Sequence, residues 1–211
     1  MTAAPPKGPL AGIKVVEFGQ NLAGPYCGQI LAFLGADVVK VERPGGDDAR
    51  KWGPPFVDGD AVGFIALNRG KSSITCDLGD PAQRDALIQR IGAADVFVHN
   101  LRADVPSKFG IDGPTLTGRF PRLIYADLGA FGHVGPWKNR PGYEPIIQAV
   151  AGLISLNGDP SGPEARIGVS IVDLSTGMWT AIGVLAALAR RSATGQGSLV
   201  NTSLFESGLM W

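Results

Sequence analysis

Apolar runs and helical patterns alternate along the chain. Short runs of mostly apolar residues predict buried strands, and apolar residues that recur every three or four positions predict helices. Strands alternating with helices are typical of a parallel sheet covered by helices, so the chain is predicted to be α/β with an open parallel sheet. The predicted strands are residues 13–18, 37–42, 73–78, 95–99, 122–128 and 198–203.

The helices between these strands begin and end at residues with known preferences. Pro25 opens the first helix, which carries apolar side chains at i, i+3, i+4 and i+7 and stops at Gly35. Asp80 caps the next helix, with Pro81 at its first position. Further helices are predicted at residues 144–153, 173–191 and from 204 onward, and a long surface loop is predicted at residues 44–63.

The long helix is apolar apart from one carboxylate. Residues 166–191 are almost uncharged between their ends, and Asp173 is the charge inside them. The apolar stretch at residues 174–189 is too short for a comfortable membrane span of about 20 residues and predicts a buried core helix. Asp173 is either a helix cap, a position that Asp favours, or a carboxylate placed as a nucleophile, and the two roles are compatible.

Composition narrows the function classes. The formal net charge is zero, which argues against bulk binding to nucleic acid or to a membrane surface. Cys27 and Cys76 lie far apart, so neither a disulfide framework nor a zinc site is indicated, and free thiols fit a cytoplasmic protein. The first residues contain no apolar segment typical of a signal peptide. His99 and His133 are too few for a metal site and are interpreted as structural.

Ligands of open parallel sheets bind beyond the carboxyl ends of the strands. The loop at residues 19–25 follows the first predicted strand but lacks the glycine fingerprint of dinucleotide-binding loops. It is either a plain tight turn or a place where backbone N–H groups meet a ligand. Basic residues near the strand ends either converge on a ligand phosphate or form a solvated rim. These residues are Arg43, Lys71, Arg102 and Lys108.

Several blocks of the sequence together carry a resemblance to one family. They include "PLAGIKVVEFGQNLAGPYCGQILAFLGADVVKVERPGGDDAR", "NRGKSSITCDL", "DVFVHNLRADVPSKFGI", "RPGYEPIIQAVAGLISLNG", "RIGVSIVDLSTGMWTAIGVLAALARRSATGQG" and "VNTSLFES". In this order and spacing they closely resemble the family III CoA-transferases, from about Pro9 onward. The resemblance implies a single Rossmann-like large domain at residues 1–211 and a smaller domain that these residues do not include.

The resemblance implies a catalytic aspartate. The family's nucleophile is an aspartate at a helix start with a glycine four residues later, which corresponds to Asp173 and Gly177. Its carboxylate attacks an acyl-CoA thioester to give a mixed anhydride, and the CoA thiolate returns to form an aspartyl-CoA thioester. An acceptor carboxylic acid then takes the CoA. Coenzyme A and acyl-CoA are thus substrates, and no permanently bound cofactor or metal is expected.

The resemblance also implies where CoA binds, with basic residues of the rim meeting its phosphates. The family commonly has Leu and Lys where this chain has Cys76 and Gly79, so one phosphate contact is either missing or supplied by Arg140. The implied CoA-binding residues are Leu22, Ala23, Arg43, Cys76, Asp77, Leu78, Gly79, Asn100, Leu101, Arg102, Lys108, Pro141, Gly142, Tyr143 and Glu144.

Two alternatives to transfer remain open. The related α-methylacyl-CoA racemases have a histidine where this chain has Tyr143, and a tyrosine of pKa about 10 is a poor proton shuttle, which favours transfer. A silent CoA-binding or partner subunit is the other alternative. The family forms interlocked homodimers. Residues 1–211 alone are expected to be oligomeric or poorly soluble because the apolar tail LFESGLMW lacks cover, and inactive because the family's glycine-rich lid is not among them.

Overall fold

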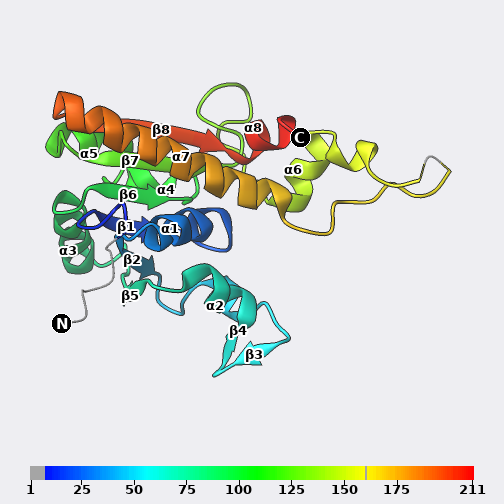
Figure 1. Ribbon diagram of the computed structural model, residues 1–211, viewed down its shortest axis with the longest axis horizontal. Helices are drawn as coiled ribbons and strands as arrows, with labels where there is room; N and C mark the ends of the chain where they lie inside the picture. Colours follow the sequence, from blue (N-terminus) through cyan, green and yellow to red (C-terminus); the bar gives the residue numbers. More distant parts are fainter. Residues whose placement is uncertain (1–7, 160) are drawn as a thin grey trace, which may run out of the picture.

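A six-stranded parallel sheet forms the centre of the computed structural model, which describes residues 8–159 and 161–211 (Figure 1). The strands lie in the order β5-β2-β1-β6-β7-β8. In this doubly wound arrangement the strand order reverses beside the first strand, so the predicted Rossmann-like sheet is confirmed. The strands are β1 (Lys14–Phe18), β2 (Asp37–Glu42), β5 (Ser72–Thr75), β6 (Val96–His99), β7 (Ile124–Gly129) and β8 (Ser198–Ser203).

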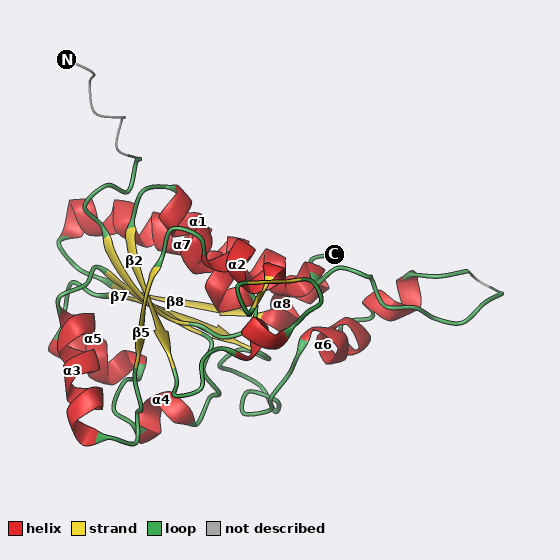
Figure 2. Cartoon of the chain, turned by 90° about the horizontal axis from the view of Figure 1, so that it is seen from below, coloured by secondary structure: helices red, strands yellow, loops and turns green. Residues whose placement is uncertain are grey.

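Helices cover both faces of the sheet (Figure 2). One face carries α1 (Ala23–Phe33) and α7 (Ile171–Thr194), and the other carries α3 (Pro81–Gly92) and α5 (Gly113–Arg119). Each face has its own cluster of buried apolar side chains. Two helical layers around one sheet therefore form the core, as the alternation of patterns predicts.

Strand β6 shows how one strand serves both layers. Val96 and Val98 belong to the cluster under α1 and α7, and Phe97 between them belongs to the cluster under α3 and α5. Successive side chains of a strand point to opposite faces, so a strand buried on both faces reads as a continuous apolar run. This is why the central strands can be predicted from the sequence.

Helix α7 packs closely against α1. Gly177 allows this approach, because a Cβ at that position would lie 2.8 Å from the carbonyl oxygen of Ala23. Within the described part of the chain, α7 is the one helix long and apolar enough to cross a membrane, and 44% of its apolar window is buried inside the structure. Its packing against α1 and the sheet is that of the predicted core helix.

The predicted loop at residues 44–63 contains regular structure. It holds a 3₁₀ turn, η1 (Asp48–Lys51), a hairpin of β3 (Phe56–Val57) and β4 (Asp60–Ala61), and the start of α2 (Val62–Asn68). Arg50 joins these pieces, because its guanidinium binds Glu42 and Asp60 at 2.7 Å each and lies 4.0 Å from the Phe64 ring centre. The predicted long surface loop therefore contains short elements that were not predicted, since two-residue strands leave no alternation to detect.

Smaller differences concern the ends of elements. Helix α6 (Glu144–Val150) ends before residue 153, because Gly152 adopts a left-handed φ of 86°, and a 3₁₀ turn, η2 (Leu153–Leu156), follows. The short helices α4 (Val105–Lys108) and α5 were not predicted. The predicted last helix is confirmed as α8 (Leu204–Leu209), whose cap Ser203 accepts a hydrogen bond from the Glu206 N–H at 3.1 Å.

Candidate active site

A cavity of about 1,210 Å³ lies at the carboxyl ends of the strands. All six strands contribute a residue at or just after their ends: Cys76 after β5, Arg43 after β2, Phe18 in β1, Asn100 after β6, Leu128 in β7 and Leu204 after β8. The strand order reverses between β1 and β6, and ligands of doubly wound sheets bind at such a reversal. The cavity therefore lies where the fold predicts a ligand.

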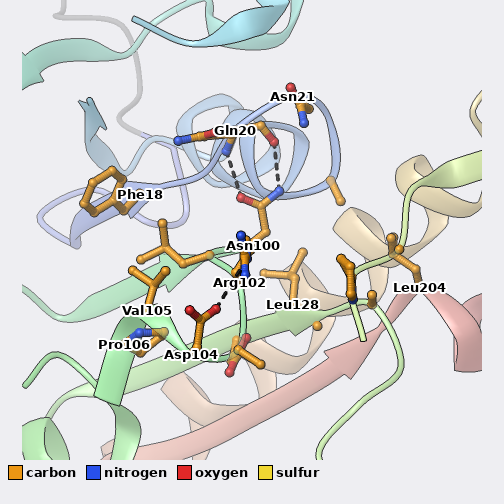
Figure 3. Close-up of a pocket in the computed structure, with 18 of the residues that line it drawn as sticks. Phe18, Gln20, Asn21, Asn100, Arg102, Asp104, Val105, Pro106, Leu128 and Leu204 are labelled. Atoms are coloured by element: carbon orange, nitrogen blue, oxygen red, sulfur yellow. Dashed lines mark hydrogen bonds and ion pairs between the residues drawn. The ribbon is translucent and has the colours of Figure 1, made fainter. Parts of the chain in front are cut away.

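The loops after β1 and β6 are joined at this reversal (Figure 3). The Asn100 side chain accepts a hydrogen bond from the Gln20 N–H and donates one to the Gln20 carbonyl, both at 2.8 Å. Asn21, Leu22 and Ala23 continue the cavity wall from there. The loop at residues 19–25 is thus part of the cavity, as its ligand-binding interpretation requires.

The structure brings nearly all of the predicted site residues to this cavity. The exception is Lys108, whose neighbours Ser107 and Phe109 line the cavity while its own ammonium lies 5.2 Å from the Phe109 ring centre. Arg140 lines the cavity as well. The predicted residues that line it are Leu22, Ala23, Arg43, Cys76, Asp77, Leu78, Gly79, Asn100, Leu101, Arg102, Pro141, Gly142, Tyr143, Glu144 and Asp173.

The four basic residues near the strand ends do not converge as a group. Arg43 and Arg102 are exposed side chains of the cavity wall, and Arg43 pairs with Asp48 at 2.5 Å. Lys71 instead has a side chain that is 1% exposed and pairs with Glu17 at 2.6 Å. Neither alternative left open for Lys71, contact with a ligand phosphate or a place in a solvated rim, fits the structure, because the buried Glu17 carboxylate holds its ammonium.

Asp173 lies in the first turn of α7 and is not the N-cap of that helix. Ser170 holds the cap position, and its side chain makes no capping hydrogen bond. The Glu144 carboxylate caps the helix instead: Oε1 accepts from the Val172 N–H at 3.2 Å, and Oε2 accepts from the Asp173 N–H at 2.7 Å. The cap interpretation of Asp173 was therefore wrong, because a residue of another helix satisfies these N–H groups.

Glu144 is fixed by its own helix. It is the first residue of α6 and is buried, and Gln148 one turn later donates a hydrogen bond to Glu144 Oε1 at 2.7 Å. The Gln148 amide oxygen in turn accepts from the Ile167 N–H at 2.8 Å, in the segment that leads into α7. The i, i+4 spacing of Glu144 and Gln148 is visible in the sequence, but the contact by which Glu144 caps α7 is not.

The Asp173 carboxyl is partly buried in the cavity wall. Burial, and then the charge of Glu144, raise the pKa of Asp173 from 3.8 to about 7. Such a carboxyl is partly ionised near neutral pH, and its carboxylate is more basic than an ordinary one. A strongly shifted pKa inside a cavity is typical of a functional group, so Asp173 is suited to act as a nucleophile or a base.

Asp173→Asn is expected to stabilise the fold above about pH 7. The carboxyl ionises near 3.8 in the unfolded chain and near 7 in the folded one, so ionisation destabilises the folded state increasingly between these values. The full difference corresponds to about 4 kcal/mol at most. Denaturant unfolding near pH 4 and near pH 8 measures the gain, which should be large only at the higher pH. An equal gain at both would mean that Asp173 ionises like an exposed carboxyl.

The two histidines have different environments. His99 is buried with Nε2 2.6 Å from the Tyr125 hydroxyl, and burial lowers the pKa of its ring, which fits a structural role. His133 is exposed, lines the cavity and lies 3.4 Å from the Asp127 carboxylate. Sequence reasoning missed His133 and Asp127 as cavity residues, although the place of Asp127 at the end of a predicted strand was a usable signal.

The two cysteines are free and buried. Burial raises the pKa of both thiols, so both are protonated at neutral pH, and Cys76 lines the cavity in that form. Among the described residues, no group of three or more His, Cys, Asp or Glu side chains is placed to hold a metal ion.

Comparison with known proteins shows close relatives. Residues 10–211 match the model of CoA-transferase family III. The chain is 42% identical to the succinate–glutarate CoA-transferase of Agrobacterium fabrum and 41% identical to the succinyl-CoA:mesaconate CoA-transferase of Haloarcula hispanica, in each case over 95% of this chain and 52% of the relative. A crystal structure of a CAIB/BAIF family protein from Brucella suis matches with a TM-score of 0.93 at 42% identity, over 97% of this chain and 55% of that one. The chain thus spans about half the length of the curated relatives it matches.

Proposed function

The chain belongs to CoA-transferase family III, and on this premise we propose that it moves CoA from an acyl-CoA thioester to a carboxylic acid. The observation that carries the proposal is the position of Asp173, a carboxyl with a raised pKa in the wall of a cavity built by all six strand ends. A large cavity of about 1,210 Å³ suits an extended ligand such as CoA.

The proposed reaction has four covalent steps. An Asp173 oxygen attacks the thioester carbonyl, the C–S bond breaks, and a mixed anhydride and the CoA thiolate result. The thiolate attacks the Asp173 carbonyl and displaces the donor acid, which leaves an aspartyl-CoA thioester. The acceptor carboxylate then attacks that thioester and releases the thiolate, forming a second anhydride. Attack of the thiolate on the acceptor carbonyl forms the new acyl-CoA and restores the Asp173 carboxylate.

The surroundings of Asp173 fit these steps. Its backbone is held by the bond of 2.7 Å between its N–H and Glu144, so the carboxyl keeps its place through successive attacks. Its raised pKa makes the carboxylate a better nucleophile, while a useful fraction is still ionised at neutral pH. Over the whole exchange one thioester is broken and one is formed, so the transfer of CoA proceeds without an external energy source.

Arg43→Ala is expected to raise the KM for acyl-CoA roughly tenfold, because a charge-assisted hydrogen bond to a phosphate contributes about 1.5–3 kcal/mol, less what is needed to free Arg43 from Asp48. Arg119→Ala removes an exposed cation of the same type that does not line the cavity and is the matched control, with no change in KM. Added salt should weaken wild-type binding more than Arg43→Ala binding. Equal KM values for the two variants would place the phosphates away from Arg43.

Trapping separates transfer from its alternatives. The protein, as encoded in full, is incubated with acyl-CoA and hydroxylamine, and a hydroxamate on Asp173 supports transfer. His133 lies in the same cavity and gives a racemase-type proton transfer some support, so α-deuterium exchange from solvent is measured in parallel. Exchange without a hydroxamate would favour the racemase, and binding of CoA with neither would favour a silent subunit.

The relatives' names suggest the class of acid. The names of the Agrobacterium fabrum and Haloarcula hispanica relatives both contain dicarboxylic acids or their CoA thioesters: succinate and glutarate in the first, and succinyl-CoA and mesaconate in the second. Small dicarboxylic acids are therefore the acceptors that we propose for this chain. A screen with succinyl-CoA as the donor, in which each acid is tested singly for conversion to its CoA thioester, measures this preference, and activity with monocarboxylic acids alone would contradict it.

A further inference from the structure

Four charged side chains form a buried cluster in contact with the loop after β1, which lines the cavity. Two are acidic and two are basic: Glu17 in β1, Lys40 in β2, Asp47 before η1, and Lys71 before β5. Their side chains are at most 1% exposed, and none of the four lines the cavity. Burying charged groups costs free energy even when each is paired, and the mechanism proposed above uses none of these four side chains. Their presence therefore suggests a further role.

Lys40 makes the contacts that connect the cluster to the cavity. Its ammonium lies 3.2 Å from Glu17 Oε1 and 3.0 Å from Asp47 Oδ2. Its third contact is a hydrogen bond of 2.7 Å to the carbonyl oxygen of Gly19, the first residue after β1. Lys40 therefore ties two buried carboxylates to the backbone of the loop that leads into the cavity.

Glu17 holds the other side of the cluster. Its Oε2 accepts a hydrogen bond of 2.6 Å from Lys71, whose ammonium also donates to the Pro25 carbonyl in α1 at 2.7 Å. Gly28 leaves the space that the carboxylate occupies, because a Cβ there would lie 2.4 Å from Glu17 Oε2. The cluster thus sets the position of α1 against β1 as well as the loop between them.

For Glu17 and Lys40 the partner charges outweigh the effect of burial, whereas for Lys71 burial is the stronger effect and lowers the pKa. Burial alone would raise the pKa of Glu17, but Lys71 and Lys40 outweigh it and lower that pKa. Burial alone would lower the pKa of Lys40, but Glu17 and Asp47 outweigh it and raise that pKa. Lys40 therefore stays charged across the physiological range and keeps its bond to the Gly19 carbonyl.

Three successive residues of the loop after β1 are each hydrogen-bonded through the backbone to a side chain outside the loop. Lys40 binds Gly19, Asn100 binds Gln20, and the Asn21 N–H donates to Asp47 Oδ1 at 3.0 Å. Asn21 has a left-handed φ of 63°, a conformation that needs support from its surroundings when the residue is not glycine. Gln20 and Asn21 line the cavity at the strand-order reversal.

We propose that Lys40 is a positioning residue: with Glu17 and Asp47, it fixes the backbone of residues 19–21 in the conformation that binds the CoA thioester. The proposal rests on the proposed function for the identity of the ligand. The fixing of the loop itself does not depend on that identity. Lys40 touches no substrate and acts through the Gly19 carbonyl and Asp47.

An ion pair between the buried Arg191 and the partly buried Asp95, at the opposite end of the sheet, provides a control. Arg191 binds the Asp95 carboxylate at 2.8 Å and the carbonyl oxygens of Asp95 and Arg122, at the amino ends of β6 and β7. It is also a buried cation that binds a carboxylate and a backbone carbonyl, and it lines no part of the cavity. A general loss of stability should therefore follow from changing either cation, whereas a loss of ligand affinity should follow only from changing Lys40.

Lys40→Met and Arg191→Met are compared by titration calorimetry with CoA and by amide hydrogen exchange. Lys40→Met should bind CoA about tenfold more weakly, and the Gln20 and Asn21 amides should exchange faster. Arg191→Met should lower the melting temperature without either change. Equal loss of CoA affinity in both variants would overturn the proposal.

A double variant separates position from charge. Lys40→Met leaves one excess negative charge in the cluster, and Lys40→Met/Glu17→Gln removes it without restoring the bond to Gly19. The double variant should regain melting temperature but not CoA affinity, and recovery of both would overturn the proposal. If the wild type binds no CoA, the proposed function fails separately from the positioning role. Faster amide exchange confined to Gln20 and Asn21 in Lys40→Met would then still support the positioning role, and unchanged exchange would refute it.

Discussion

Asp173→Asn is expected to abolish CoA transfer while CoA binding stays within a few-fold of the wild-type value. An amide of nearly the same shape keeps the packing of the first turn of α7, but it cannot attack a thioester, so turnover should fall by at least roughly 10³-fold. Because Glu144 caps the helix, the variant loses no cap. Transfer assays and calorimetry with CoA measure the two effects.

The control for Asp173→Asn is its own stability. The variant should be at least as stable as the wild type above about pH 7, so a loss of turnover cannot be attributed to unfolding. Hydroxylamine should label the wild type and not the variant. Near-normal turnover of Asp173→Asn would show that Asp173 is not the nucleophile.

Glu144→Gln is expected to move the acidic side of the pH–rate profile to lower pH. Burial is the larger cause of the raised pKa of Asp173, and the charge of Glu144 is the second, so removing that charge should lower the pKa towards its ordinary value of 3.8. The nucleophile then stays ionised in more acidic solution, and the ratio of kcat near pH 6 to kcat near pH 8 should rise. Steady-state rates across pH measure this, and an unchanged profile would exclude Glu144 from setting the ionisation of Asp173.

The same variant should lose stability. A glutamine has one acceptor oxygen for the two N–H groups of Val172 and Asp173 that the carboxylate now serves. Leaving a buried donor without a partner costs about 1–3 kcal/mol, partly offset by the lower cost of ionising Asp173. Gln148→Leu, which removes a neighbour of Glu144 but no charge, should lower stability without the shift of the profile.

The parts of this fold that could be predicted are those with a local cause. The central strands are apolar on both faces, and the helix after Asp80 begins with a cap and a proline, so each is specified within a few residues. The pieces between residues 44 and 63 are too short to show a period, and their order comes from Arg50, which binds partners on either side of it. No local pattern could have predicted them.

The residues of the site also fall into a group that could be predicted from local sequence and a group that could not. Residues at strand ends could be placed at the cavity, because parallel strands all end at one edge of the sheet. The cap role of Asp173 could not be excluded from the sequence, because the group that caps α7 lies 29 residues earlier in the chain. The buried position of Lys71 could not be predicted because its partner Glu17 lies 54 residues away. Such pairings depend on the folded structure and leave no periodic signal in the sequence.

The carboxyl ends of the strands build the cavity and the amino ends carry a stabilising ion pair, so substitutions at the two ends should have different effects. Side chains at or after the ends of the strands build much of the cavity, whereas the bond between Arg191 and Asp95 lies at the amino end of β6, and neither of these two residues lines the cavity. Laboratory evolution towards a new acid should therefore draw its useful variants from the loops after the strands. Stabilising substitutions found around Arg191 should raise the free energy of unfolding of these loop variants almost independently of the loop changes, since distant sites rarely couple.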